Sequence, residues 1–415
     1  MQRYRAALDT AGGCAAAAVA GLALIVPVDS GCGGGPSALQ VELLSITVPR
    51  ATAAGAIVAV LAAVCVSMFG SRAAWGTATV AALVLATDHL LVTSTSTSLA
   101  TANFIDSLSA GVLLGAAGAA ALENRPSAIG YVLGALTGLA VGDHVETFAA
   151  EYGGRSLLER AFLDLPPTWL TGATVVLLAG CFLTRHRRVV NYPTTLELPF
   201  GPVLAAAVVI TTITVVPERL ASSTGSPVAI AVSVLVTVAV SMLAALLLPG
   251  RDGTLTLLAV ALAGTGSAIA LAAQAHWKIA PMLLAIVAGL AAGLLRPAPL
   301  AAGTAILAVA VFALLGPVAP RDDSWITLVG SCAIAAVSGY CFGSAPTRSA
   351  AGTVLPLGIL LLPSAVLTLE YHSCTTASTH TVADDHRPAL TALAVVVGCL
   401  LAIVALRRWR PEPAA

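Results

Sequence analysis

Long apolar runs alternate with short polar breaks along almost the whole chain. A run of about 17–25 apolar residues is long enough to cross a bilayer as one helix. The sequence predicts fourteen such spans, at residues 9–27, 51–69, 73–94, 103–122, 127–147, 167–184, 199–217, 226–248, 254–273, 279–295, 298–316, 325–344, 350–369 and 388–406. We therefore predict an all-α polytopic membrane protein. An even number of spans places both termini on the same side of the membrane.

The composition supports this class. Of the 415 residues, 58% are hydrophobic and only 10% are charged, whereas a soluble domain carries about 25% charged residues. The formal net charge is zero, so a nucleic-acid partner is not expected. The first run has the basic flank and apolar core of a signal peptide. Because more spans follow it, we interpret it as an uncleaved first helix.

The arginines orient the spans. If both termini lie inside, thirteen of the twenty Lys and Arg residues fall in inner segments, and every inner break contains an arginine. Positive charge gathers on the cytoplasmic side of membrane proteins. We therefore predict a plasma (inner) membrane protein with both termini cytoplasmic.

Three inner loops repeat at nearly one offset. Arg296 follows Arg72 by 224 residues, Arg348 follows Arg125 by 223, and the basic cluster at Arg407 follows the cluster at Arg185 by 222. This offset corresponds to eight spans. It predicts a six-helix bundle at 1–190, two linker helices at 191–252 and a second six-helix bundle at 253–415, which is a transporter architecture. The alternative is that evenly sized spans produce the regularity by themselves.

The fifth span, "GYVLGALTGLAVGDH", carries a glycine at every fourth position. That spacing places Gly130, Gly134, Gly138 and Gly142 on one helix face. Small residues on such a face let a neighbouring helix approach closely. We therefore predict a helix-packing surface here.

The arrangement of six, two and six spans resembles the fourteen-helix branch of the major facilitator superfamily, many of whose members are proton-driven exporters. The loop "FGSRAAWG" is similar to the family's inner-loop motif at Gly70, Arg72 and Gly76, and Arg296 is its counterpart in the second half. The resemblance implies an inner-loop gate at these four residues. The family's loop aspartate and its arginine in the fourth span are absent.

The glycines of the fifth span are similar to the family's antiporter motif, although its proline is missing. If the similarity extends to function, it implies export rather than import.

Acid–histidine pairs occur twice near the ends of apolar runs, in "ATDHLL" and "VGDHVETF". Charged residues inside spans are costly and usually face a cavity or a partner. We predict that the acidic and histidine side chains on the outer side line a cavity for protons and substrate. These candidates are Asp88, His89, Asp106, Asp143, His144, Glu146 and Glu370.

Within this set, Asp88 lies deepest and is the best candidate for protonation, with His89 as a relay. Adjacent helical residues point about 100° apart, so these two side chains do not both face one cavity squarely. The alternative is that all of these residues are interfacial and have no role.

Metal binding and a disulfide are weaker alternatives. The outer loop "EYHSCTTASTHTVADDHRP" holds several potential ligands, but an exposed polar loop explains it better, and no metal site is predicted. Cys32 and Cys374 fall in outer loops, where a disulfide is chemically permitted. The family resemblance implies that helix 2 and the thirteenth span meet, which would allow this pair to form.

The leading hypothesis is a secondary transporter that exports a hydrophobic or amphipathic small molecule in exchange for protons. Its partners would be the bilayer, the substrate and protons, and other membrane proteins remain open. No Walker loop, zinc-protease helix or nucleophile elbow occurs, so neither an enzyme nor a cofactor is expected. One alternative is a scaffold that keeps the transporter fold. Another is a lipid-modifying glycosyltransferase, which Asp29 and Glu42 disfavour because they lie far apart in the first outer loop.

Overall fold

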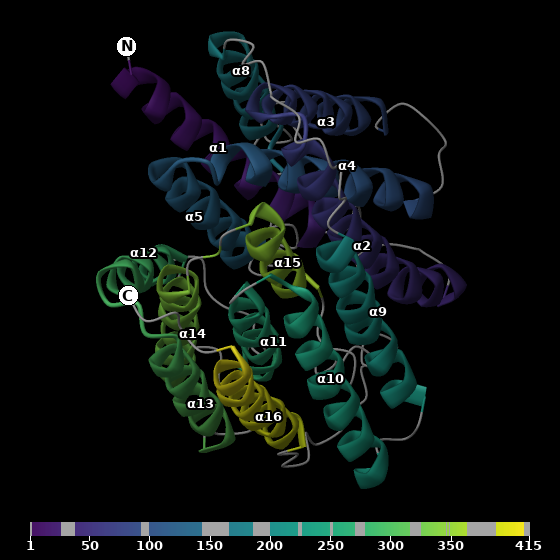
Figure 1. Ribbon diagram of the computed structural model, residues 1–415. Coiled ribbons are helices and arrows are strands. Elements are labelled where there is room, and N and C mark those ends of the chain that lie inside the picture. The colour runs from purple at the N-terminus through teal and green to yellow at the C-terminus, as the bar shows by residue number, and fades with distance from the viewer. Residues whose placement is uncertain are drawn as a thin grey trace. The chain divides into compact units, whose positions relative to one another are not determined.

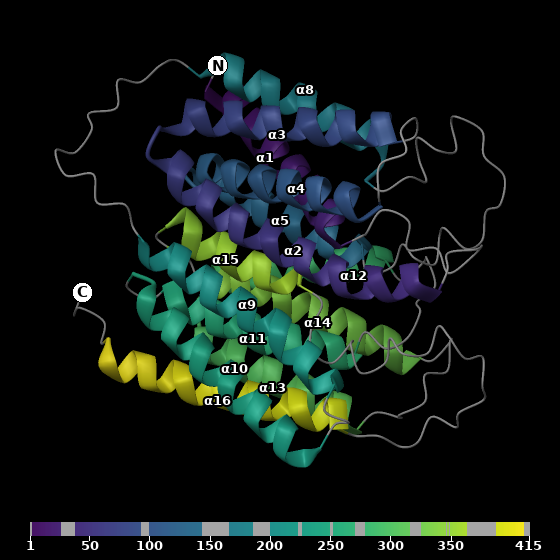
Figure 2. The same cartoon turned by 90° about the vertical axis from the view of Figure 1, so that its right-hand side faces the viewer.

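The structure is a computed structural model, shown in Figures 1 and 2. It describes residues 2–25, 38–92, 99–142, 166–185, 200–222, 226–249, 252–269, 279–315, 325–345, 347, 349–362 and 387–410. All regular structure within these ranges is helical.

The fourteen helices of the described ranges correspond one to one with the fourteen predicted spans. They are α1 (Gln2–Ile25), α2 (Ala38–Ser67), α3 (Ser71–Val92), α4 (Leu99–Ala121), α5 (Arg125–Gly142), α8 (Thr168–Thr184), α9 (Phe200–Ser222), α10 (Pro227–Leu247), α11 (Asp252–Ile269), α12 (Ile279–Leu295), α13 (Pro299–Leu315), α14 (Trp325–Ser344), α15 (Ala350–Leu360) and α16 (Arg387–Trp409). The prediction of an all-α polytopic membrane protein is confirmed.

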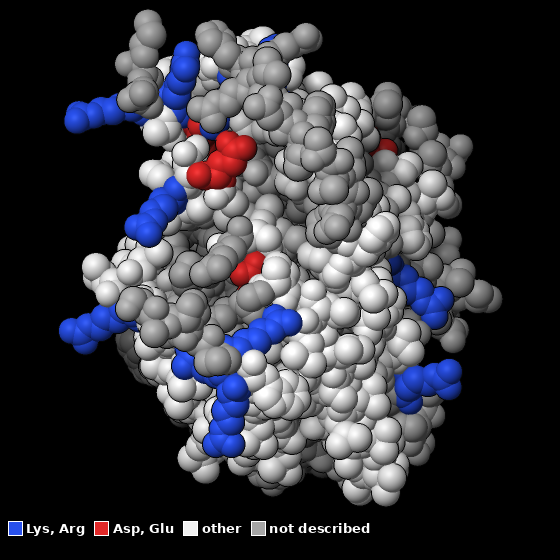
Figure 3. Space-filling model, viewed as in Figure 1, with Lys and Arg blue, Asp and Glu red and all other residues white. Residues whose placement is uncertain are grey.

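By length and composition alone, five described helical segments could cross a membrane: Arg3–Ile25, Val48–Ser67, Asn103–Ala121, Pro227–Leu247 and Ala389–Trp409. The segment Pro227–Leu247 has a mean hydropathy of 2.6 and is only 17% buried within the protein. On the face drawn in Figure 3, charged side chains are few and scattered, and most of the described surface is uncharged. An exposed apolar surface of this kind is suited to lipid rather than to water.

The start of α2 and the end of α15 differ most from the predicted spans. The second span was predicted to begin at residue 51, after the Pro49–Arg50 pair, but α2 begins at Ala38 and carries Pro49 inside it. A proline within a membrane helix is tolerated because neighbouring groups compensate for the lost hydrogen bond. The thirteenth span was predicted to reach residue 369, whereas α15 ends at Leu360.

The chain divides into two compact units, and each is described by itself. The first contains Met1–Val203 together with Ser349–Leu361, and the second contains Leu204–Arg348 and Leu362–Ala415. α15 therefore belongs to the first unit, where it packs on α2 and α4. The predicted boundaries at residues 190 and 252 separate two sequence repeats from two linker helices. They are not boundaries of these compact units, and they stay a prediction.

The helix pairs inside each unit follow a common plan. In the first unit α2 packs against α4, α1 against α8, and α3 against both α4 and α8. In the second unit α12 packs against α14, α11 against α16, and α13 against both α14 and α16. Each of these second-unit helices lies eight spans after its first-unit counterpart. The fifth helices differ, because α5 packs on α1 whereas α15 packs on α2.

The glycine face of α5 packs directly on α1, as the spacing predicted. A Cβ atom added at Gly134 would overlap the carbonyl oxygen of Cys14. A Cβ at Gly130 would lie 2.7 Å from Cγ2 of Thr10, and one at Gly138 would lie 2.7 Å from the carbonyl oxygen of Ala18. At Gly142 the nearest atom would be Cγ2 of Ile25, at 3.2 Å. Gly130, Gly134 and Gly138 therefore let the backbones of α1 and α5 meet at successive turns, and Gly142 faces the Ile25 side chain.

Other helix pairs use the same device. A Cβ at Gly111 of α4 would overlap the backbone of Gly55 in α2, and one at Gly289 of α12 would overlap the backbone of Ala336 in α14. Lipid tails are as apolar as leucine, so van der Waals contact rather than the hydrophobic effect holds membrane helices together. Close backbone approach maximises that contact.

We predict that Gly134→Ala destabilises the protein by about 1–3 kcal/mol, because the new methyl group forces α1 and α5 apart. Gly172→Ala is the matched control, since nothing lies within 4 Å of a Cβ at Gly172 in α8. The control is expected to stay within about 1 kcal/mol of the wild type. Thermal unfolding of the purified protein in detergent measures both. Equal midpoints for the two variants would contradict the packing described.

Candidate functional site

Three of the predicted site residues lie together where α3 ends and α4 begins. Asp88 and His89 belong to the last turns of α3, and Asp106 lies in the second turn of α4. α3 and α4 pack side by side. The candidates from two separate apolar runs therefore form one cluster.

The side chain of Asp106 is the centre of this cluster. Its Oδ2 atom lies 3.6 Å from Nε2 of His89, within reach of an ion pair when the histidine is protonated. The Asp88 carboxyl lies near enough to interact electrostatically with the Asp106 carboxyl. Although Asp88 and His89 are adjacent on their helix, both reach the same residue because it lies on the neighbouring helix.

Burial separates the two acids. Asp106 is only 4% exposed, whereas Asp88 is half-buried. The sequence ranked Asp88 as the deepest acid, but the structure buries Asp106 more completely. Asn103, one helical turn before Asp106 on α4, is equally buried at 4% exposed. Two buried carboxylate oxygens, Oδ2 of Asp88 and Oδ1 of Asp106, have no hydrogen-bond partner among the described residues.

This arrangement is suited to holding a proton. Two neighbouring carboxylates repel each other, so the pair is favoured when one of them carries a proton. A protonated imidazole at 3.6 Å would instead balance the charge of Asp106. The negative charge of Asp106 can therefore be neutralised either by a proton on the carboxyl pair or by a protonated His89. A change from one arrangement to the other moves one proton.

The other predicted members of the cavity lie outside the described residues. These are Asp143, His144, Glu146 and Glu370. Cys32 and Cys374, the predicted disulfide partners, also lie outside them. Their roles stay predictions.

The residues of the predicted inner-loop gate lie where α2 joins α3, within α3 and after α12. Gly70 joins α2 to α3 with φ of +83°, a left-handed conformation that favours glycine. The guanidinium of Arg72 lies 5.0 Å from the centre of the Phe182 ring of α8. A Cβ at Gly76 would lie 3.1 Å from that ring. Arg296 follows α12, and its carbonyl oxygen accepts a 3.2 Å hydrogen bond from the Tyr340 hydroxyl.

A charged network at the other end of the first unit was missed by the sequence analysis. Arg185, which caps the C-terminus of α8, donates from Nη2 to Oδ2 of Asp9 in α1 at 2.7 Å. Its Nη1 donates to Oγ of Ser71 at 3.1 Å and lies 3.5 Å from Oε2 of Glu123. The Asp9 side chain is 7% exposed. The sequence did contain a sign of this network, because Asp9 follows Arg3 and Arg5 at the start of the first apolar run.

Within the described ranges, no group of three or more His, Cys, Asp or Glu side chains is placed to hold a metal ion.

No protein-family model and no curated protein matches the chain. Solved structures do. The inward-open xylose transporter XylE from E. coli is 12% identical, covers 99% of this chain and 96% of its own, and has a TM-score of 0.47. An auto-inhibited POT family peptide transporter is 13% identical, covers 99% and 98%, and has a TM-score of 0.45. XylE bound to 6-bromo-6-deoxy-D-glucose, described as a major facilitator superfamily proton:xylose symporter, is 12% identical, covers 98% and 95%, and has a TM-score of 0.47.

We predict that Arg185→Gln destabilises the first unit by about 1–3 kcal/mol, because it leaves the Asp9 carboxylate buried without its partner. The control is Arg125→Gln, which removes an exposed arginine after the Glu123 turn. Adding Asp9→Asn to Arg185→Gln is expected to recover part of the loss. Chemical unfolding of the three variants measures the effect, and an Arg185→Gln protein as stable as the Arg125→Gln control would refute it.

Proposed function

We propose that the protein is a secondary transporter of the plasma membrane that exports a hydrophobic or amphipathic small molecule in exchange for protons. The observation that carries this proposal is the cluster of Asp88, His89 and Asp106, because titratable side chains inside membrane helices are costly and usually functional. The two units pair their corresponding helices in the same way, which supports a repeat of six helices. In transporters, such repeats alternate access to a central site. The arginine distribution supports cytoplasmic termini.

In the proposed cycle, Asp106 and Asp88 hold one proton between them when the site is open to the acidic side. Loss of that proton leaves a buried carboxylate on Asp106 beside a half-buried one on Asp88, which is unfavourable unless His89 is charged or the substrate compensates. The protonated and deprotonated forms of the Asp88–Asp106 pair are therefore stabilised by different conformations of the protein around them. That difference is what couples proton movement to a conformational change.

Metabolite and lipid profiling of a deletion strain tests the transport claim. The cell interior and the medium are measured separately in the deletion strain and in the complemented strain. Under the proposal, at least one compound accumulates inside the deletion strain and falls in its medium. If no compound changes compartment, the transporter proposal fails, and the membrane-scaffold alternative takes its place.

We predict that Asp106→Asn abolishes this export while leaving the fold intact, since an amide has the same shape but cannot carry the exchanged proton. Asp88→Asn is expected to have the same effect. Glu123→Gln is the matched control, because it makes the same chemical change beyond the other end of α4. Membrane abundance and thermal unfolding verify folding. Full export by both aspartate variants would exclude the cluster from the mechanism.

A further inference from the structure

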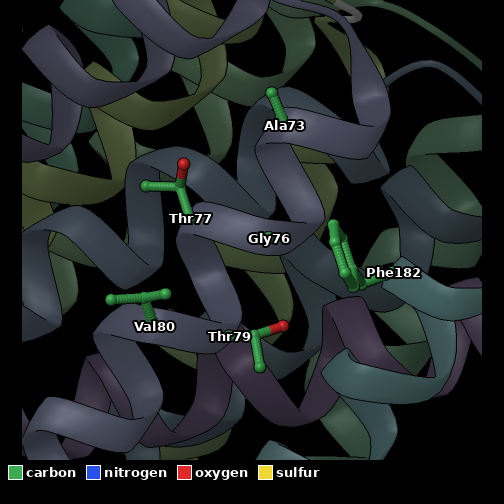
Figure 4. Close-up of a pocket in the computed structure, with 6 residues that line it drawn as sticks. All are labelled: Ala73, Gly76, Thr77, Thr79, Val80 and Phe182. Carbon is green, nitrogen blue, oxygen red and sulfur yellow. The ribbon is translucent and has the colours of Figure 1, made fainter. Parts of the chain in front are cut away.

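A lateral groove lies between α3 and α8 in the first unit. It has a volume of about 490 Å³ and is lined by Ala73, Gly76, Thr77, Thr79, Val80 and Phe182. Figure 4 shows the Phe182 ring of α8 beside the turn of α3 that carries Gly76. The lining holds no charged residue, so the groove is suited to a hydrocarbon chain.

Glycine keeps the groove open. A Cβ at Gly76 would lie 3.1 Å from Cε2 and 3.2 Å from Cδ2 of Phe182. Val80, one turn further along α3, is 60% exposed. The groove therefore opens onto the surface that membrane lipid covers, and Phe182 forms one of its sides.

A positive charge stands at one end of the groove. Arg72 precedes Ala73 in the first turn of α3, and its guanidinium lies 5.0 Å from the centre of the Phe182 ring. A cation over an aromatic face is attracted by the ring and held in position. No carboxylate of the described segments forms an ion pair with Arg72, in contrast to Arg185, which contacts two. Within the described segments, the Arg72 charge therefore remains available to an anion.

We propose that this groove binds one acyl chain of an anionic phospholipid whose phosphate contacts Arg72. The arrangement matches such a lipid, because the apolar groove would hold the acyl chain and the Arg72 guanidinium at its end would meet the phosphate near the membrane surface. Arginine matches phosphate geometry well. Anionic lipids are concentrated in the cytoplasmic leaflet, and the loop that carries Arg72 is predicted to lie on that side.

The groove is separate from the proposed proton site. Arg72 and Asp88 lie sixteen residues apart on α3, which is about 24 Å along a helix. The lipid site therefore does not depend on the proposed transport function. A chain that serves only as a scaffold would still have it.

Native mass spectrometry of the delipidated full-length protein tests the proposal. The probes are dioleoylphosphatidylglycerol, which is anionic, and dioleoylphosphatidylcholine, which is zwitterionic. The wild type is expected to bind its first phosphatidylglycerol more tightly than phosphatidylcholine. Arg72→Gln should weaken phosphatidylglycerol binding about fivefold, the effect of one basic residue near a membrane surface, and leave phosphatidylcholine binding unchanged.

A second variant tests whether the groove itself binds the acyl chain. Ala73→Leu fills the groove without removing the charge, and it should weaken the binding of both lipids. The matched controls are Arg125→Gln, which removes an exposed arginine at the start of α5, and Ala173→Leu, which adds the same bulk at an exposed position of α8. Both controls should bind as the wild type does. Equal losses in Arg72→Gln and Arg125→Gln, or no preference for phosphatidylglycerol in the wild type, would overturn the proposal.

Discussion

Close contact between helix backbones is the constraint on which this structure depends. Inside a bilayer, burying apolar side chains provides no net drive for helices to associate, so their stability comes from packing. Glycine and alanine at matching turns supply it, between α1 and α5, between α2 and α4, and between α12 and α14. Bulkier residues at Gly111 or Gly289 would separate whole helices, because the neighbouring atoms are backbone and cannot move aside.

The same tight packing determines where charge can exist. Of the charged residues inside the first unit, Asp9 is paired with Arg185, and Asp106 is approached by His89 and Asp88. In the first arrangement Arg185 pairs with Asp9 and also approaches Glu123, and it links α1 to the end of α8. The second is compensated only if a proton is present, so its charge can change. This difference distinguishes a structural ion pair from a candidate coupling site.

The sequence predicted the helices well because apolar runs and arginine-bearing breaks mark where membrane spans begin and end. It predicted the glycine face of α5 from spacing alone, but not that α1 is the helix that packs on it. It selected Asp88, His89 and Asp106 as members of a larger outer cavity. That these three side chains meet directly depends on how α3 and α4 are rotated, which periodicity in a uniformly apolar helix does not specify. α2 begins thirteen residues before the predicted second span, and Pro49 does not end it, because neighbouring groups in a membrane helix compensate for the lost hydrogen bond.

The most direct test is to measure flux of the exported compound in liposomes that contain the purified protein, with a pH gradient imposed in either direction or absent. Transport coupled to protons through the Asp88–Asp106 pair predicts that the compound moves against its own gradient when protons flow the opposite way, and that reversing the pH gradient reverses this movement. Flux that is the same with and without a pH gradient would contradict the account.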